Sequence, residues 1–452
     1  MKKRAITAIL AGVTALSTMA GCGSQGGDTK TTSGSETQTE STETKTSENG
    51  SKLKLTVMDC YAAEDPQGKF VYQYADEFME QNPDIEIEIQ AVASNDIYTK
   101  LAAMATSIDE LPTIFFTSAD QVPTLYDLGL TSDLTDLFSE EEKGKLANGV
   151  LDAAMIDGQM TYYPVAVQPQ AVIYRMDRFE EAGLEIPTTW DEFVECAKAL
   201  TKDTDQDGTV DQWGFSMVGS NDSSGQSRFM SYLWSNGFDC VKEEGDEWVT
   251  DITADVSFVD TFSRWTQMNA DGLVPTGITE SNYSTSANYF AMGYTSMFLS
   301  GPNALGVAYS SNPDLQGKLG SFKMPGDFPG TMLGAEGYAI NSYASDEEKE
   351  AAAKWLTFFA EHDGEYQFWQ SSGKIPATQA GQQVEYITGE DYKGFLEQIA
   401  DGCRPTLAFP GIAGLKSALG NAYSAVFSNE KDNQAAVEGL VSEISELLED
   451  YN

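Results

Sequence analysis

The sequence predicts an α/β fold in which a largely parallel sheet carries helices on both faces. Two observations predict it. Segments with strand and helix periodicity alternate from residue 52 to residue 117, and 452 residues are enough for two or three domains or for two large lobes. The 41% of hydrophobic and 11% of aromatic residues can form a substantial core.

The first five elements follow in the order strand, helix, strand, helix, strand. We expect them near residues 52–59, 70–79, 85–90, 96–107 and 113–117. Asn82 and Pro83 end the first helix, because proline disfavours helical geometry in the residue before it. Ligands of open α/β sheets bind beyond the carboxyl ends of the strands, which directs attention to Tyr61 and Asp120.

Two capping boxes mark the starts of later helices. Thr189 is followed three residues later by Glu192, and Ser345 by Glu348, each ahead of apolar residues at helical spacing. Between the first five elements and these helices, a turn that begins at Asp157 leads into a strand expected to continue to Tyr174. Apolar residues at helical spacing over 437–448 predict a C-terminal amphipathic helix.

The first 21 residues have the form of a secretory signal. Three cations at residues 2–4 precede an apolar stretch that is shorter than the roughly 20 residues of a spanning helix. The run Met19-Ala20-Gly21-Cys22 resembles a bacterial lipobox, which implies that Cys22 is lipidated and becomes the mature N-terminus. Residues 22–51 would then be the lipidated cysteine and a disordered tether without large apolar side chains. An ordinary signal peptide with a chance cysteine is the alternative.

Charge and composition exclude several classes of function. With 27 Lys and Arg against 70 Asp and Glu, the net charge of −43 argues against a nucleic-acid partner. The single histidine argues against His-based metal sites and His-dependent catalytic triads. The chain also lacks a G-x-S-x-G elbow, an H-E-x-x-H pair and a P-loop.

Several short segments carry a pattern shared with a known family. The central ones are Tyr174-Arg175-Met176-Asp177, Ala182-Gly183-Leu184 and Pro187-Thr188-Thr189-Trp190. Further ones are Asn82-Pro83-Asp84-Ile85, Gly293-Tyr294-Thr295-Ser296-Met297, Gly301-Pro302, Gly337-Tyr338-Ala339-Ile340 and Gly373-Lys374-Ile375-Pro376-Ala377. In this order they span most of residues 52–452, and they resemble the extracellular solute-binding proteins of ABC sugar importers, which include the maltodextrin-binding proteins.

The resemblance implies two α/β lobes joined by a multi-strand hinge, each lobe a mostly parallel sheet flanked by helices. By position, the chain crosses between lobes near residues 166–168, 312–314 and 373–377. Residues 52–166 and 314–373 would then form lobe 1, and residues 167–313 and 374–452 lobe 2. Sugar binding between the lobes would draw them together, and the closed form would be recognised by the membrane subunits of an ABC importer. We therefore expect a monomeric carrier, not an enzyme, held at the outer face of the cell membrane by its lipid alone.

Sugar recognition needs flat aromatic faces together with planar amides or carboxylates. The predicted strand ends, crossings and glycine-rich turns supply both, at Tyr61, Asp120, Gln168, Gln170, Asn221, Asp222, Trp234, Asn303 and Glu336. Each of these alone is better explained as a loop or core residue, whereas the converging set indicates a carbohydrate site.

Two departures from the family pattern limit the ligand. Maltodextrin-binding members usually carry Trp directly after the Gly-Pro motif, where this chain has Asn303, and an aromatic residue where Thr117 stands. The loss of two stacking surfaces argues against a long α-glucan. A monosaccharide or short, more polar oligosaccharide fits better.

An acidic loop matches the first half of an EF-hand, with carboxylates at Asp203, Asp205, Asp207 and Asp211. Position twelve is Gly214 instead of a bidentate glutamate, so we favour a polar hairpin turn over a structural calcium site. No other cofactor is expected. The remaining cysteines allow three disulfide pairings or a set of free, buried thiols, at Cys60, Cys196, Cys240 and Cys403.

The alternative function is a lipid-anchored extracellular enzyme that acts on glycosides through paired carboxylates. With 70 acidic residues, a pair at suitable spacing is always available, so their number decides nothing. An adhesin or scaffold is a third class, although it would not need two α/β lobes. Binding without turnover would separate the carrier from the enzyme.

Overall fold

The computed structural model describes residues 52–361, 370, 373–404, 407 and 409–452, apart from Pro66 and Asp246. The signal segment, Cys22 and the tether lie outside the described residues. Residues 50–452 form one unit, which holds two larger sheets. Within the described part of the chain, every helix is too short or too polar to cross a membrane.

The first sheet has six strands in the order β14-β6-β13-β3-β1-β2. Four of them run in one direction, and these are β1 (Leu53–Asp59), β2 (Ile85–Ala91), β3 (Ile114–Ser118) and β6 (Tyr163–Val167). The other two, β13 (Glu336–Ile340) and β14 (Ile375–Pro376), run the opposite way. The reversed β13 arrives from the second sheet and so enters at the edge where β3 and β6 end.

The second sheet has four strands in the order β12-β7-β11-β8. Three run in one direction, and these are β8 (Trp213–Ser216), β11 (Thr295–Ser300) and β12 (Leu319–Phe322). The strand β7 (Ala171–Arg175), which comes directly from the first sheet, is reversed. In each sheet most strands share one direction, and both sheets contain parallel and antiparallel pairs. The reversed strands β7 and β13 are each the first strand after a crossing of the chain.

The chain passes between the sheets at three places, and two of them differ from expectation. The predicted strand to Tyr174 is two strands in different sheets, interrupted at residues 168–170, where Pro169 has no N–H to donate. The return passage lies between Phe322 and Glu336 and not near residues 312–314, because β12 pairs with β7. The predicted boundary at residues 312–314 is instead a turn of 3₁₀ helix at Pro313–Leu315, capped by Asn312.

The third passage follows β14, which pairs with β6 and so belongs to the first sheet and not to the second. The assignment of residues 374–376 to lobe 2 is therefore wrong, as is that of residues 319–322 to lobe 1. Both errors have one cause. The sheet to which a strand belongs is decided by pairing with strands far away in the sequence, and the local sequence of a short strand does not predict that pairing.

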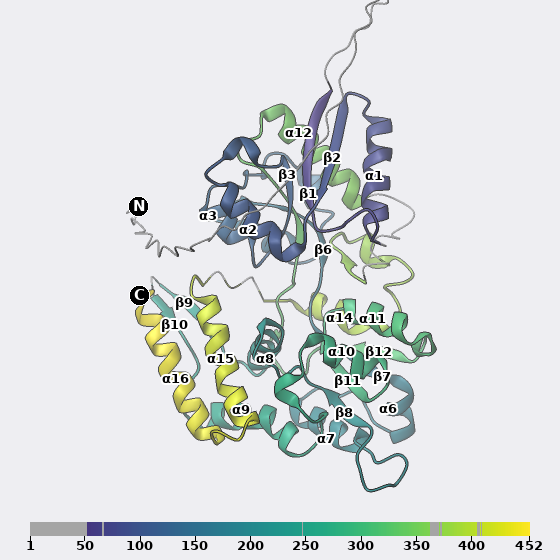
Figure 1. The fold of residues 1–452 in the computed structure, drawn as a ribbon, viewed down its shortest axis with the longest axis vertical. Helices are drawn as coiled ribbons and strands as arrows, with labels where there is room; N and C mark the ends of the chain where they lie inside the picture. Colours follow the sequence, from purple (N-terminus) through teal and green to yellow (C-terminus); the bar gives the residue numbers. More distant parts are fainter. Residues whose placement is uncertain are drawn as a thin grey trace, which may run out of the picture. The chain divides into compact units, whose positions relative to one another are not determined.

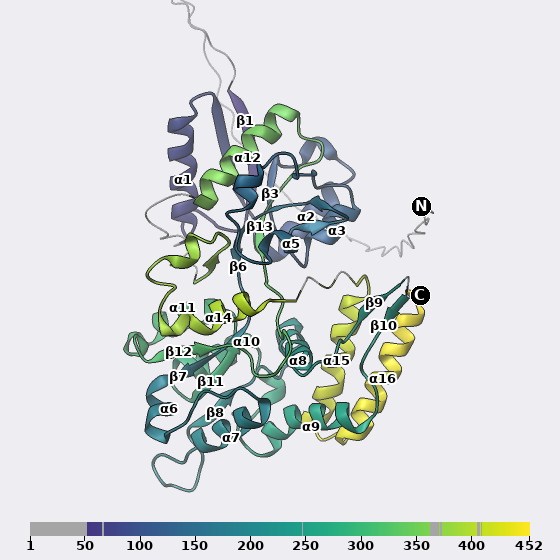
Figure 2. The ribbon, with the colours of Figure 1, turned by 180° about the vertical axis from the view of Figure 1, so that it is seen from behind.

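Helices cover both faces of the first sheet. Figure 2 shows α12 in front of β1 and β3, whereas in Figure 1 these strands lie in front of it. The helices and short elements of this part are α1 (Gly68–Gln81), α2 (Ser94–Met104), η1 (Ile108–Glu110), α3 (Val122–Asp127), α4 (Glu140–Lys143), α5 (Val150–Ala153), β4 (Met155–Ile156), β5 (Gln159–Met160) and α12 (Asp346–Glu361). The predicted helix near residues 70–79 and the strands on either side of it are thus confirmed.

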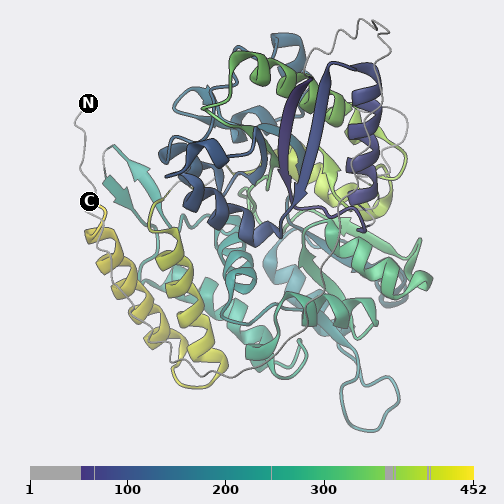
Figure 3. The same ribbon diagram turned by 45° about the horizontal axis from the view of Figure 1, so that its top comes forward.

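More helices pack around the second sheet. They are α6 (Met176–Ala182), α7 (Trp190–Leu200), α8 (Ser223–Ser235), α9 (Val256–Ala270), η2 (Ile278–Glu280), α10 (Tyr283–Ala291), α11 (Asn303–Ser311), η3 (Pro313–Leu315), α14 (Glu390–Asp401), α15 (Ile412–Phe427) and α16 (Asn433–Glu449). The short turn η4 (Gly381–Gln383) lies against β14 of the first sheet instead. A hairpin of β9 (Lys242–Glu244) and β10 (Glu247–Val249) stands apart from the sheet. The two C-terminal helices, α15 and α16, run side by side (Figures 1 and 3).

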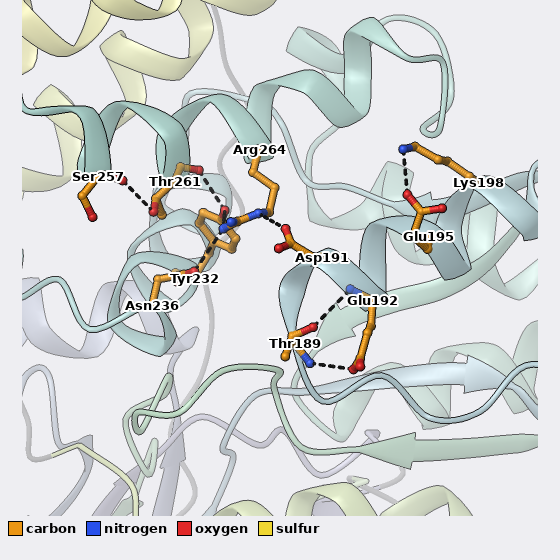
Figure 4. A network of polar contacts seen from close by, with 10 residues as sticks. All are labelled: Thr189, Asp191, Glu192, Glu195, Lys198, Tyr232, Asn236, Ser257, Thr261 and Arg264. Atoms are coloured by element: carbon orange, nitrogen blue, oxygen red, sulfur yellow. Dashed lines mark hydrogen bonds and ion pairs between the residues drawn. The ribbon is translucent and has the colours of Figure 1, made fainter.

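The capping box predicted at Thr189 is confirmed. Its hydroxyl accepts the Glu192 N–H at 3.2 Å, and the Glu192 carboxylate accepts the Thr189 N–H at 3.1 Å (Figure 4). The adjacent Asp191 binds Arg264 of α9 at 2.7 Å, so the start of α7 is tied to a second helix. The box of Ser345 and Glu348 is confirmed as well, with distances of 2.8 and 3.3 Å.

The four cysteines of the body are free thiols. Cys196 and Cys240 are buried among apolar side chains of the second sheet's core, and Cys60 and Cys403 are half-buried. The structure thus supports the alternative of unpaired cysteines.

Candidate ligand-binding site

A polar pocket of about 330 Å³ lies where the two sheets meet. The first sheet contributes the carboxyl ends of β3 and β6 and the start of β13, with lining residues Ser118, Ala119, Asp120, Gln168, Gly334, Ala335 and Glu336. The rest of the wall comes from Gln170, Ser223, Ser227, Arg228, Gly301, Asn303, Met332 and Lys416. The position follows from the strand directions, because β3 and β6 end at the edge where β13 begins.

Five of the nine residues predicted from the sequence line this pocket, namely Asp120, Gln168, Gln170, Asn303 and Glu336. Asp120 is exposed and accepts the Ser118 hydroxyl at 2.6 Å. Asn303 donates its amide to the Tyr283 hydroxyl at 2.8 Å. The side-chain oxygen of Gln170 is buried and accepts no hydrogen bond from the described residues. The pocket therefore offers carboxylates and amides, the groups that match sugar hydroxyls.

Three polar residues, each at an end of a strand of the first sheet, are joined at the pocket's first-sheet side. Gln168 donates its amide to Glu336, and the Lys374 ammonium donates to the other oxygen of the Glu336 carboxylate. The Lys374 and Glu336 side chains are 13% and 18% exposed. We call Gln168, Glu336 and Lys374 the crossing triad, since it links the residue after β6, the first residue of β13 and the residue before β14.

Tyr61 does not line the pocket, but it supports the crossing triad. Its hydroxyl accepts a hydrogen bond from Lys374, whose ammonium also lies 5.2 Å from the centre of the Tyr61 ring and 5.7 Å from that of Phe116. Burial disfavours the charged form of Lys374. Attraction to Glu336 and the hydrogen bonds outweigh burial and raise the pKa of Lys374 above its ordinary value. Lys374 is thus held as a cation.

Sequence reasoning missed Lys374, Arg228 and Lys416. The Arg228 guanidinium is buried on α8, where it donates to the carbonyl oxygens of Leu299 at 2.8 Å and Ser224 at 2.9 Å. Burial lowers its pKa to about 10. Lys374 lies inside Gly373-Lys374-Ile375-Pro376-Ala377, one of the segments shared with the family. Its place directly before the apolar pair Ile375-Pro376 could have marked it as a candidate site residue. For Arg228 no local signal exists, since a helical arginine is ordinarily on the surface.

The remaining predicted residues lie elsewhere. Asp222 caps α8, and its carboxylate accepts the N–H groups of Ser224 at 2.8 Å and Gly225 at 3.1 Å. Asn221 is bound to Asn421 on α15 at 3.0 Å. Trp234 is 2% exposed and packs in the core of the second sheet. Asp222 and Asn221 make their hydrogen bonds at the start of α8, and Trp234 packs in the core, so none of the three lines the pocket.

The acidic loop after α7 gathers carboxylate oxygens of Asp203, Asp205 and Asp211 within 4.8 Å of one another. Asp207 is not part of this group, and its N–H donates to the Asp203 carboxylate at 3.2 Å. The loop lies outside the pocket lining. A polar turn stays the prediction for this loop, with a structural calcium site as its alternative.

Comparison with known proteins gives the same architecture. Residues 62–366 match the family described as bacterial extracellular solute-binding protein. A binding protein of Brucella abortus (strain 2308) is 22% identical over 407 residues, which are 88% of this chain and 93% of that protein. The diacetylchitobiose binding protein DasA of Streptomyces coelicolor is 25% identical over 340 residues, 73% of this chain and 74% of that protein.

The solved structure of the sugar-binding protein MalE from Xanthomonas citri is 18% identical and superposes with a TM-score of 0.73, covering 88% of this chain and 98% of that one. The two-lobed α/β fold of such binding proteins is therefore the fold of this chain. Because the family match extends over about two thirds of the sequence and reaches from the first sheet through the second and back, this chain belongs to the bacterial extracellular solute-binding proteins.

Proposed function

We propose that the protein captures a carbohydrate in the pocket between its two sheets and delivers it, unaltered, to the membrane subunits of an ABC importer. The observation that carries this proposal is the pocket itself. Its lining comes from both sheets and includes Gln168 and Glu336, which stand on two of the three passages between them. A ligand held there contacts both sheets, and its binding free energy can bias their arrangement.

The lining chemistry favours a small glycan. Amides and carboxylates accept and donate to hydroxyl groups, and a volume near 330 Å³ is at the lower end of the range for ligand pockets, about 300–1,000 Å³. The names of two relatives, a diacetylchitobiose binding protein and a sugar-binding protein, support the same class. We infer a monosaccharide or short oligosaccharide, with the protein acting as a monomer.

The proposal includes an anchor. Lipidation of Cys22 would hold the protein at the extracytoplasmic face of the cell membrane, with residues 23–51 as a tether, and the family's extracellular character supports this location. Mass spectrometry of the membrane-bound protein tests it. An acylated Cys22 at the N-terminus is expected, and an unmodified N-terminus at another residue would overturn the anchor without affecting the sugar site.

A thermal-shift screen tests the binding function. A ligand at 100 times its Kd adds about 2.7 kcal/mol to the free energy of unfolding, which raises Tm by a few degrees. The panel holds mono-, di- and oligosaccharides and polyols, and each sugar that raises Tm is recovered and checked for cleavage. We expect a shift with an intact sugar. No shift across the panel, or cleavage of the bound sugar, would overturn the proposal.

A matched pair of variants places the sugar in the pocket. Asp120→Asn changes a lining carboxylate that is exposed, and should reduce the ligand-induced shift while leaving the Tm of the free protein near wild type. Asp84→Asn makes the same change of charge at an exposed position just before β2 and outside the pocket lining, so it should leave the shift intact. Equal shifts for the two variants would exclude this pocket.

A further inference from the structure

The charges around the pocket differ from those of the rest of the chain. The protein has 70 acidic and 27 basic side chains, yet the pocket is lined by two acids, Asp120 and Glu336, and two bases, Arg228 and Lys416. Glu336 is already paired with Lys374. Apart from Glu336, the pocket therefore holds one carboxylate, Asp120, and two cations, Arg228 and Lys416. The protein as a whole carries a large excess of negative charge.

Arg228 is the most unusual of these groups. It is 8% exposed, and among the described residues no carboxylate forms an ion pair with it. Its hydrogen bonds go to two carbonyl oxygens and, at 3.4 Å, to the Ser300 hydroxyl, and its guanidinium lies 5.1 Å from the centre of the Tyr283 ring. A buried cation is costly without an anion, so the missing counter-charge calls for an explanation.

The nearest acid of its own helix does not fill that role. Asp222 attracts Arg228 electrostatically, but its carboxylate is occupied by the N–H groups of Ser224 and Gly225 and by the hydroxyls of Ser220 and Ser224, both at 2.7 Å. A guanidinium has five N–H donors, and three contacts to described residues leave two of them for a ligand. These donors belong to a residue that lines the pocket.

Two further features make the same wall favourable for an anion. Lys416 of α15 lines the pocket, is half-buried, and has no salt bridge to any described carboxylate. Ser223, the first residue of the 13-residue helix α8, lines it as well and adds a hydroxyl group to the same wall. Arg228, Lys416 and Ser223 together we call the cationic wall.

We infer that the pocket selects a sugar that carries a carboxylate, such as a hexuronic acid, with the carboxylate on Arg228 and Lys416 and the sugar hydroxyls on Asp120 and Glu336. A carboxylate is planar and bears one negative charge, which suits the fork of a guanidinium. A phosphate dianion would lie in the same small pocket as the Asp120 carboxylate, which has no salt bridge to a cation of the described residues, so it fits less well. This inference rests on the proposed function, because it names the class of sugar that the carrier takes.

Calorimetry with matched ligands tests the charge directly. The probes are D-galacturonate, its methyl ester and D-galactose, with D-glucuronate and D-glucose as a second set and a hexose 6-phosphate as a third. The acid should bind roughly 10- to 100-fold tighter than its ester or neutral parent, as expected for a charge-assisted hydrogen bond. The preference should fall when salt is added, because the pocket is open to solvent.

Variants of the cationic wall test the assignment of residues. Lys416→Gln and Arg228→Gln should each reduce the affinity for the acid more than the affinity for its ester, so that the preference for the acid falls. Lys431→Gln makes the same charge change beyond the other end of α15, at an exposed site outside the pocket lining, and should leave the preference unchanged. Thermal unfolding shows whether Arg228→Gln is folded, and Lys416→Gln alone carries the test if it is not.

The outcomes separate this inference from the proposed function. Equal affinity for acids and neutral sugars, or a preference for the hexose phosphate, would overturn the carboxylate inference and leave the sugar carrier standing. An acid preference that both wall variants retain would overturn it too. If no sugar of any charge binds, the proposed function falls and this inference falls with it.

Discussion

The hydroxyl of Tyr338 on β13 lies 2.8 Å from Oδ2 of Asp59 at the end of β1, and the two strands flank β3. Asp59 is 0% exposed, and its other oxygen accepts the Tyr61 N–H at 3.3 Å. Burial raises the pKa of Asp59 to about 6, and these hydrogen bonds limit the rise. A titratable carboxyl at the end of β1 is therefore joined to β13, the strand that begins at Glu336.

Asp59→Asn should stabilise the protein at high pH. The pKa of Asp59 in the folded protein lies above the ordinary value of 3.8. The carboxyl's favourable contribution to the free energy of unfolding is therefore complete below pH 3.8 and is lost as pH rises through about 6. The variant avoids this loss, and its gain at pH 8 should be up to about 3 kcal/mol, vanishing near pH 4. Urea unfolding at pH 4, 6 and 8 measures it. A variant that is less stable than wild type at pH 8 would show that the hydrogen bonds outweigh the charge.

Lys374→Met should destabilise the protein by about 3 kcal/mol, because it leaves the Glu336 carboxylate poorly solvated and without its cation. Adding Glu336→Gln should recover part of that loss, and a double-mutant cycle in urea measures the coupling. The pair Lys393 and Glu390 is the control, since its side chains are 55% and 62% exposed and its coupling should stay below about 1 kcal/mol. Equal coupling in the two pairs would contradict the structural role given to the crossing triad.

Thr189→Ala should cost about 1 kcal/mol, because it removes one half of the capping box at the start of α7 (Figure 4). Thr189→Ser keeps the hydroxyl and should remain close to wild type. Urea midpoints at constant m-value give both numbers. A serine variant as unstable as the alanine variant would mean that the methyl group, and not the cap, stabilises this corner.

The four thiols should react slowly in the native protein. Burial raises the pKa of Cys403 to about 12 and raises the pKa of Cys196 above its ordinary value, so little thiolate forms at pH 8. A chromogenic disulfide reagent should detect almost no thiol at first and all four body cysteines after denaturation without reductant. A count of two or none after denaturation would reveal disulfides and would restore the alternative of paired cysteines.

Elements of both sheets could be predicted from the sequence where their signals are local. The alternation in β2 and the capping box at Thr189 follow from neighbouring residues alone. The pairing of β12 with β7 could not be predicted, because it joins segments roughly 145 residues apart whose pairing no local pattern records.

The difference between local and long-range signals also explains which residues of the pocket could be predicted. Gln168 and Glu336 were found because crossings and glycine-rich turns mark where strands end, whereas Arg228 gains its role from Leu299 and Ser300, far away in the sequence. Trp234 failed as a site residue for the opposite reason. Aromatic side chains at helical spacing are first of all core, and the surrounding rings of α8 and α9 confirm it here.

The reversed strand β13 has a consequence for how the chain matures. In the finished sheet Phe116 of β3 pairs with Tyr338, roughly 220 residues later, so the middle of the sheet closes only after most of the chain has been synthesised. Contacts of such long range make folding slow. Any fragment that ends before Glu336 leaves β3 with a bare edge, ready to pair with another copy. We therefore expect a chain that is terminated before Glu336 to aggregate and not to fold into a functional fragment.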